Sequence, residues 1–188
     1  MNIIPTKFSD VLLVEPTVFG DDRGFFYESY SEEVYKVNGI ELNFVQDNHS
    51  LSQTPGTIRG MHYQLSPKAQ TKLVRATRGA IYDVVVDIRK GSPTYGEWEG
   101  FILTADNKRQ LLVPQGFAHG FCTLVENTEV QYKVDQIYSK EHDRGISWND
   151  PKIGIKWPVS YPILSEKDKN HPTLEYADNN FEWEAIKI

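Results

Sequence analysis

The sequence predicts a predominantly antiparallel β fold, of the jelly-roll, barrel or sandwich type, with a few short helices at its margins. Apolar, β-branched and aromatic residues occur in short runs that fit the two-residue period of strands. Thirteen glycines and ten prolines interrupt the 188-residue chain, which favours many short strands over long helices. A chain of this length most simply forms one domain with one core, over residues 1–188.

The predicted elements follow one another with short connections. Residues 77–79 and 126–127 resemble tight links between neighbouring strands. A short helix is expected over residues 31–38, because Ser31 suits an N-cap and acidic residues follow it. A second helix is expected to start at Ser165, with Asp168 three residues after the cap. The predicted strands span residues 24–30, 44–49, 57–64, 73–77, 80–88, 98–104, 110–113, 120–125 and 128–134.

Charge and cysteine content exclude several classes of function. The formal net charge of −6 argues against broad binding to nucleic acid or to a membrane surface. Any anionic ligand must therefore be held by a local cluster of Arg and Lys. The single cysteine, Cys122, has no internal partner and lies in an apolar run, which indicates a buried thiol. No leader pattern and no apolar stretch of membrane-spanning length is visible, so we expect a cytoplasmic protein.

Titratable residues recur along the predicted strands. The run Arg59-Gly60-Met61-His62-Tyr63-Gln64 places a cation and an imidazole three residues apart. Lys72, His119 and Tyr132 follow on or beside later strands. A base, two cations, a second histidine and a phenol suit an enzyme that moves protons on an anionic substrate.

Strand alternation indicates which of these side chains point inward. Tyr132 shares a face with Val130 and Val134, so it points inward, either as a core tyrosine with a bonded hydroxyl or as a functional group. Lys72 shares a face with Val74. An inward lysine is costly unless it meets an anion or a hydrogen-bonding cavity, but a place near a strand start also allows it to reach solvent.

The strand over residues 57–64 leaves two alternatives for its titratable side chains. His62 shares a face with Ile58, which suits a satisfied core histidine as well as a base that meets His119 and Lys72. Arg59 falls on the opposite face by strict alternation. Either the strand contains a bulge at this point, or Arg59 acts from the rim of the site; a solvated surface arginine is the third alternative.

Two histidines on a β fold raise the question of a metal site. Metal sites in β-barrels of the cupin type usually need a His-x-His pair, a nearby Glu and a later His. Gln64 stands where the second histidine of the pair should be, and no suitably spaced Glu follows. Lys72 beside the site would further disfavour Zn²⁺ or Fe²⁺. The sequence therefore predicts a site without a metal and an enzyme without a cofactor.

These groups suit proton abstraction from a carbon next to a carbonyl. A neutral histidine can accept the proton, and a fixed cation stabilises the oxygen of the developing enolate. A tyrosine on the other side can return a proton to the opposite face and so invert the centre. A carboxylate should orient the histidine. Asp168 and Asp83 are both candidates, and their spacing in the sequence does not choose between them.

Short motifs in a fixed order along the chain resemble those of one family. They span residues 18–26, 44–50, 59–64, 72–75, 86–89, 107–111, 114–120, 148–150 and 164–168. Together, in this order and spacing, they resemble the dTDP-4-dehydrorhamnose 3,5-epimerase family of metal-free cupins from about residue 11 to residue 172. The resemblance implies a cupin-type jelly-roll β-barrel. Met61, where the family often has Leu, is a conservative apolar change.

The resemblance also implies roles for individual residues. His62 matches the family's base and Asp168 its carboxylate partner, while Asp83 has a supporting role. Tyr132 matches the proton donor, and Lys72 the cation near the C4 carbonyl. Further matches to substrate-binding positions are Arg23, Glu28, Asp47, Asn48, His49, Arg59, His119, Asp143 and Lys167, with Tyr138 as the aromatic that stacks on thymine.

Four of these residues also have a purely structural interpretation. Asp168 suits a helix cap, Asp47 with Asn48 suits an Asx turn, and Tyr138 suits a surface position.

The reaction implied by the resemblance is epimerisation at C3 and C5 of dTDP-4-dehydro-6-deoxy-D-glucose, which gives dTDP-4-dehydro-L-rhamnose. The family implies a homodimer in which N-terminal strands pair with the partner's sheet, so that Arg23 and Glu28 serve the neighbouring site. Rival interpretations are a single-centre epimerase or ketoisomerase of the same substrate, a non-catalytic cupin that binds sugar nucleotides, and a metal-dependent cupin oxygenase.

Overall fold

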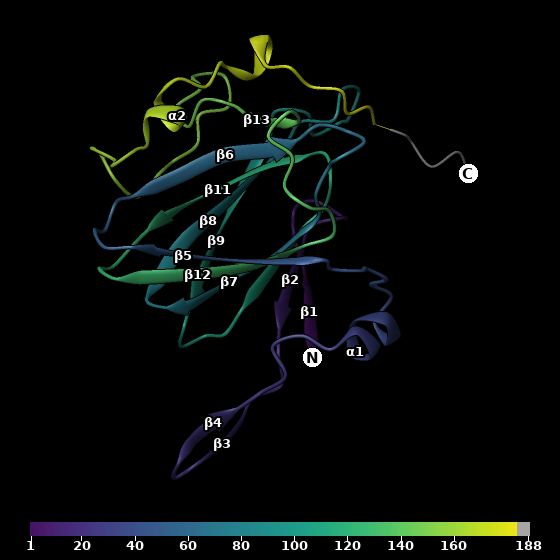
Figure 1. Cartoon of the computed structure of the whole chain (residues 1–188), viewed down its shortest axis with the longest axis vertical. Helices are drawn as coiled ribbons and strands as arrows, with labels where there is room; N and C mark the ends of the chain where they lie inside the picture. The colour runs from purple at the N-terminus through teal and green to yellow at the C-terminus, as the bar shows by residue number, and fades with distance from the viewer. Residues whose placement is uncertain (184–188) are drawn as a thin grey trace.

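The computed structural model describes residues 1–183 and consists mainly of two antiparallel β-sheets packed face to face (Figure 1). The six-stranded sheet has, in spatial order, β1 (Asn2–Pro5), β2 (Leu12–Glu15), β10 (Gln110–Val113), β7 (Lys72–Arg78), β12 (Thr128–Val134) and β5 (Gln46–Ser52). The five-stranded sheet has β13 (Asp143–Gly145), β6 (Ile58–Gln64), β11 (Phe117–Thr123), β8 (Ala80–Asp87) and β9 (Trp98–Thr104). This architecture confirms the predicted mainly β, jelly-roll class.

Alternation along each strand divides the side chains between the space between the sheets and their outer faces. In β8, Ile81 and Val85 belong to the core between the sheets, whereas Val84 and Val86 pack on the outer face. On the opposite sheet, Val130 of β12 closes the same inner core. The space between the sheets is therefore apolar over much of its length, which gives inward polar groups near one end a rigid support.

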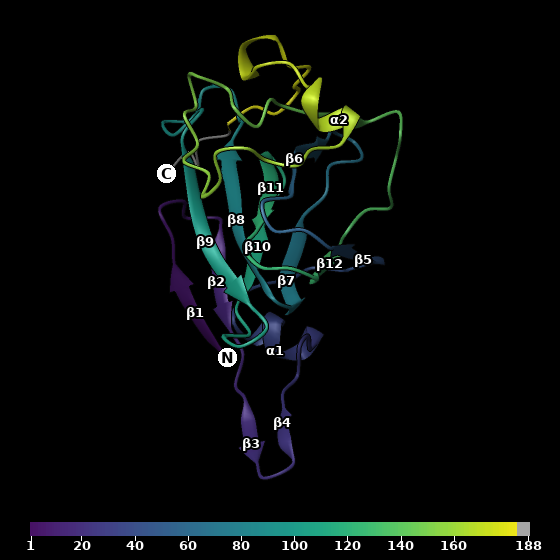
Figure 2. The same ribbon diagram turned by 90° about the vertical axis from the view of Figure 1, so that its left-hand side faces the viewer.

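Chain segments cover the outer faces of both sheets (Figure 2). Helix α1 (Glu32–Val37) begins at Ser31, whose hydroxyl accepts a hydrogen bond from the Val34 amide, and it buries Tyr35 against the six-stranded sheet. The C-terminal segment covers the five-stranded sheet and contains α2 (Glu166–Lys169) and the 3-10 turn η1 (Leu174–Tyr176). No helix within residues 1–183 has the length and apolar composition needed to cross a membrane.

A short hairpin extends away from the two sheets (Figures 1 and 2). It consists of β3 (Phe19–Asp21) and β4 (Gly24–Phe26), which pair only with each other. Three phenylalanines of this hairpin, Phe19, Phe25 and Phe26, are 63%, 63% and 67% exposed. Such a concentration of exposed aromatic rings is costly on a monomer and is typical of a protein–protein contact.

Most predicted elements are present, with some changed limits. Strands β9, β10 and β12 have the predicted bounds, and both helices begin at their predicted serine caps. The prediction of a strand over residues 24–30 was wrong after Phe26, because Tyr27 leaves the hairpin to bond Arg75 and Tyr30 packs against α1. The sequence analysis did not predict β1, β2, β3 and β13, which are three or four residues long.

Candidate active site

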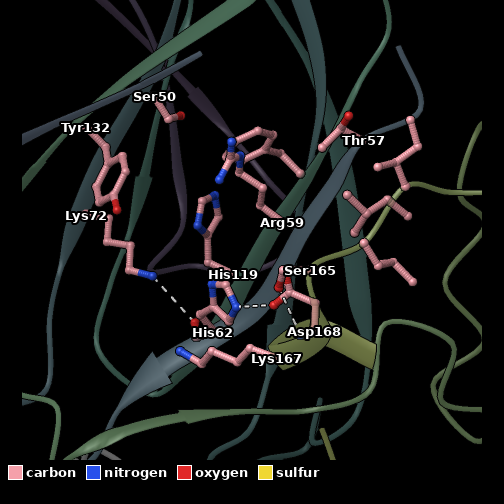
Figure 3. A pocket seen from close by; sticks show the side chains of 14 residues that line it. Ser50, Thr57, Arg59, His62, Lys72, His119, Tyr132, Ser165, Lys167 and Asp168 are labelled. Carbon is pink, nitrogen blue, oxygen red and sulfur yellow. Dashed lines mark hydrogen bonds and ion pairs between the residues drawn. The ribbon is translucent and has the colours of Figure 1, made fainter. Parts of the chain in front are cut away.

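A cavity of about 370 Å³ opens between the sheets beside α2 (Figure 3). Five of its polar side chains are residues that the sequence analysis singled out for chemistry. They reach the cavity from β6, β7, β11, β12 and the α2 segment. These five side chains belong to His62, Lys72, His119, Tyr132 and Asp168.

His62 and Asp168 form a hydrogen-bonded pair across a separation of 106 residues in the sequence. The Nε2–H group of His62 donates to Asp168 Oδ1 at 2.5 Å. Because this bond places the ring proton on Nε2, the lone pair of the neutral imidazole lies on Nδ1. Burial, together with the positive charges of Lys72 and Lys167, lowers the pKa of His62 below its usual value and outweighs the opposite effect of Asp168. The imidazole is therefore neutral at pH 7 and available as a base.

Asp168 is a buried carboxylate held by several groups. Its Oδ2 atom accepts a hydrogen bond from Ser165 Oγ at 2.8 Å, while its backbone N–H donates to the same hydroxyl at 3.1 Å. Burial raises the pKa of Asp168, but interactions with His171, His62 and Ser165 hold it well below its usual range. The sequence left Asp168 and Asp83 as alternatives for the partner of His62, and the structure selects Asp168.

Lys72 supplies a cation inside the cavity. Its side chain is buried on the inner face of β7, as alternation predicted, and its Nζ donates to the carbonyl oxygen of His62 at 3.4 Å. Burial lowers the pKa of Lys72 to about 8, against the opposing negative charges of Asp83 and Asp143. The ammonium group is thus charged at neutral pH.

Tyr132 lines the cavity from β12, on the six-stranded sheet, whereas His62 lies on the five-stranded sheet (Figure 3). Its ring packs against the inner core, as the alternation with Val130 and Val134 predicted. Burial raises the pKa of Tyr132, so the phenol keeps its proton at neutral pH. The cavity therefore holds a neutral base on one sheet and a protonated acid on the other.

His119 and Asp83 form a second, more deeply buried pair. The Nε2 atom of His119 bonds Asp83 Oδ1 at 2.5 Å, and the two side chains are 7% and 0% exposed. In the register of β8 and β11, Asp83 pairs with Phe121. His119 lies two residues before Phe121 on the same face of β11, so the side chains of Asp83 and His119 are neighbours on the inner face of the sheet. Asp83 therefore orients the His119 ring, and its supporting role in the reaction stays a prediction.

A register shift in the sheet brings Arg59 to the same cavity as His62. The pairing of β6 with β11 shifts between His119 and Phe121, and the backbones are so close that a Cβ added at Gly60 would lie 2.6 Å from the Gly120 Cα atom. The glycines at these two positions permit this contact. Of the alternatives for Arg59, the structure shows the irregular strand, with Arg59 lining the cavity.

A charged cluster lies at the mouth of the cavity. Lys167, which lines the cavity, forms an ion pair with Asp143 of β13. The hydroxyl of Tyr138 donates to Asp143 Oδ2 at 3.0 Å, and the Tyr138 side chain is largely exposed. Asp143 thus holds an exposed aromatic ring and a lysine close together.

Seven residues expected to bind substrate do not line this cavity. Asp143 and Tyr138 lie at its mouth, and the other five lie elsewhere. Arg23 is on the projecting hairpin with its side chain 90% exposed, and Glu28 lines a separate cavity near Met1 and α1. Asp47 and His49 are on the outer face of β5, where Asp47 pairs with Lys133 and His49 with Glu129. The alternative of an Asx turn at Asp47 and Asn48 was wrong, because both residues belong to strand β5. Asn48 lies opposite Tyr132 on the inner face, where it accepts a hydrogen bond from Gln46.

Several cavity-lining residues were not predicted. Alternation in β5 could have identified Ser50, because it shares the inner face with Asn48. His171, which does not line the cavity, follows Asp168 by three residues, and its Nε2 atom lies 3.7 Å from Asp168 Oδ1. No sequence signal marked it. The other unpredicted lining residues are Thr57, Ile58, Phe121, Ile163, Leu164 and Ser165.

The fold and the site together define an isomerase-type jelly roll that moves protons on carbon. A neutral histidine held by a carboxylate, a protonated tyrosine and a buried ammonium group line one cavity. This arrangement can remove a proton beside a carbonyl, stabilise the enolate and return a proton from the other side.

Comparisons with known proteins give the family. The family model for dTDP-4-dehydrorhamnose 3,5-epimerase matches residues 5–176, and the chain belongs to this family. The enzyme of that name from Shigella flexneri is 55% identical over 179 residues, which cover 95% of this chain and 98% of the relative.

Solved structures agree with this assignment. The dTDP-4-dehydrorhamnose 3,5-epimerase of Bacillus anthracis, crystallised with TDP and PPi bound, is 59% identical, with a TM-score of 0.90 over 92% of this chain and 98% of that one. The dTDP-6-deoxy-D-glucose-3,5-epimerase of Legionella pneumophila, in complex with dTDP-4-keto-L-rhamnose, is 44% identical, with a TM-score of 0.93 over 98% of this chain and 99% of that one.

Proposed function

We propose that this protein epimerises C3 and C5 of dTDP-4-dehydro-6-deoxy-D-glucose and so forms dTDP-4-dehydro-L-rhamnose. The observation that carries the proposal is the His62–Asp168 pair in a cavity that also holds Lys72 and Tyr132. Both carbons are adjacent to the C4 ketone, so one base and one enolate-stabilising cation serve both centres. No step requires a cofactor.

His62 is the proposed base. Nδ1 takes the proton from C5 or C3, and the electron pair of the broken C–H bond moves to the C4 oxygen to form an enolate. The imidazolium that results is stabilised by the charge of Asp168. The ammonium group of Lys72, charged below about pH 8, stabilises the enolate oxygen.

Tyr132 is the proposed acid. It gives its phenolic proton to the carbanionic carbon from the face opposite His62, which inverts the centre. Solvent then returns a proton to the phenolate and accepts one from the imidazolium. The support is the position of Tyr132 on the sheet opposite His62 together with its raised pKa, which keeps the proton on the phenol until the enolate forms.

The cations and the exposed ring at the cavity mouth are the proposed nucleotide-binding groups. Arg59 and Lys167 suit the diphosphate, because both are cations that line the cavity. Tyr138, with its hydroxyl anchored on Asp143, offers a ring face to thymine. His119, held by Asp83, contacts the sugar, and Asn48 extends the binding surface beside Tyr132.

The N-terminal hairpin is the proposed dimer contact. Its three exposed phenylalanines would be covered by a second copy, and the exchange would bring Arg23 and Glu28 to the partner's cavity. Asp47 and His49, on the outer face of β5, would then act at the interface or at its edge rather than on the sugar.

Proton NMR of the substrate in heavy water tests this function. The purified protein should introduce deuterium at both C3 and C5, and a coupled NADPH-dependent reductase should consume the product. Deuterium at one carbon only would identify a single-centre epimerase, and a moved carbonyl would identify a ketoisomerase. Binding without any exchange would show a non-catalytic protein and overturn the proposal.

A further inference from the structure

His171 is a buried histidine that the proposed reaction does not use. Its side chain is 10% exposed, and its ring lies edge-on to that of His62 with 5.5 Å between the ring centroids. The Nε2 atom of His171 is buried and, within the described part of the chain, has no hydrogen-bond partner. A buried polar atom without a partner is uncommon and requires an explanation.

This unpartnered nitrogen points to the acid–base pair. His171 Nε2 lies 3.7 Å from Asp168 Oδ1, the same oxygen that bonds His62 Nε2 at 2.5 Å. One ligand atom each from His62, Asp168 and His171 lies within 4.8 Å of the others. Ligand atoms that surround one ion at about 2 Å can be up to about 4 Å apart, so movements of about 1 Å would bring all three to one centre.

The chemistry of these atoms suits a particular class of ion. Two imidazole nitrogens and one carboxylate oxygen are the donor set that Zn²⁺ and its neighbours in the transition series prefer, whereas Mg²⁺ and Ca²⁺ prefer oxygen alone. His62 and Asp168 both line the cavity, which gives an ion a route of entry and a direction for water as a further ligand.

Two features oppose strong binding. The short His62–Asp168 hydrogen bond must open, and the positive charges of Lys72 and Lys167 repel a second cation near His62. The site would therefore fill only at concentrations of free ion above trace levels. A bound ion would occupy His62 Nε2, the nitrogen whose hydrogen bond to Asp168 orients the base. These properties suit an inhibitory site rather than that of a resident cofactor.

We propose that His62, Asp168 and His171 form a binding site for a divalent transition-metal ion of the Zn²⁺ class, and that the ion inhibits the enzyme. The ion takes the lone pair of His62 Nε2, so the ring proton of the neutral imidazole moves to Nδ1. Nδ1 then has no lone pair with which to accept a proton from carbon. The inhibition rests on the proposed function, but the binding of the ion does not.

Cobalt absorption tests the site without substrate. Chelator-treated protein titrated with Co²⁺ should develop visible bands that saturate at one ion per chain, and Zn²⁺ should displace them. His171→Phe keeps a ring beside His62 but removes the nitrogen, and it should weaken Co²⁺ binding by more than about 10-fold. His171→Asn gives a second variant, and His142→Asn, outside the cluster, should bind as the parent does. Equal Co²⁺ affinity in the parent and both His171 variants would overturn the proposal.

Zn²⁺ inhibition gives the second arm. Zn²⁺ should reduce deuterium exchange by the parent and by His142→Asn, and EDTA should reverse this effect. His171→Phe should retain its residual activity at the same Zn²⁺ concentration. Equal inhibition of parent and variant would mean that the ion acts elsewhere, which would also overturn the proposal. A parent that binds Co²⁺ at this site but exchanges no deuterium would refute the proposed function and leave the metal site standing.

Discussion

Replacing Asp168 by asparagine should remove the orientation of the base while keeping its shape. The parent carboxylate can only accept from His62 Nε2. An asparagine amide can instead donate to Nε2, which places the ring proton on Nδ1, the atom that has to take the proton from carbon. The Ser165 cap remains available, because the backbone N–H of residue 168 is unchanged.

The size of the effect follows from the charge that is lost. With about 4 Å between the centres of charge and an effective dielectric constant of about 20, the imidazolium–carboxylate attraction is about 4 kcal/mol. Since about 1.4 kcal/mol corresponds to a factor of ten in rate, kcat should fall by about 10³. The same change in a serine protease triad lowers kcat by about 10⁴ through the wrong tautomer. We therefore expect a loss of about 10³ to 10⁴.

The assay is deuterium incorporation at C3 and C5 under saturating substrate. Thermal unfolding should show that Asp168→Asn is folded, and Asp178→Asn, which removes an exposed carboxylate paired with Arg144, is the matched control. The control should stay within about threefold of the parent, as expected for a surface pair. A kcat for Asp168→Asn within about tenfold of the parent would refute the assigned role of the carboxylate.

Three further predictions follow from the ionisable groups. The pH profile of kcat/KM should be bell-shaped. The lowered pKa of His62 keeps the base neutral to below pH 6.5, and deprotonation of Lys72 reduces activity above about pH 8. A value of kcat/KM that still rises at pH 9 would contradict this prediction. Tyr132→Phe should lower the rate of epimerisation by about 10² to 10⁴ but reduce the rate of deuterium exchange less, since His62 can return a deuteron to the same face of the carbon. NMR separates epimerisation from exchange, and equal losses in both rates would contradict the assignment of Tyr132 as the acid. Burial raises the pKa of Asp87, but hydrogen bonds led by Arg89 hold it below the usual value of 3.8, so the folded state binds this proton less readily than the unfolded state. The contribution of Asp87 to stability is therefore complete above that value and is lost as the pH falls below it and through the lower pKa of the folded state. Asp87→Asn should therefore lower the free energy of unfolding by about 3 kcal/mol or more at pH 7 and by less at pH 3, and denaturant titrations that show equal losses would contradict this.

The inward side chains could be predicted because alternation is a local property. Tyr132 and Lys72 follow the apolar positions of their own strands, and the structure places both in the cavity. The choice of Asp168 rather than Asp83 as the partner of His62 could not be predicted, since it depends on how the C-terminal segment folds over the five-stranded sheet. The resemblance to a family supplied that pair.

Other features depended on contacts between distant strands. The face that Arg59 occupies is set by the register shift where Gly60 meets Gly120, which no pattern within the strand encodes. Asp47 and His49 were expected to bind substrate, yet both lie on the outer face of β5. Because Tyr132 points inward and pairs with Asn48, alternation in β5 places Asp47 and His49 on the outer face. The sequence could not show this, since the pairing of Tyr132 with Asn48 is known only from the structure.

The central claim is that His62 removes hydrogen from the carbons beside the ketone. It is tested most directly by His62→Asn in heavy water with the substrate present, while calorimetry follows the binding of dTDP. We predict no deuterium at C3 or C5 above the uncatalysed rate and a dTDP affinity close to that of the parent. Exchange by this variant at the parental rate would contradict the account.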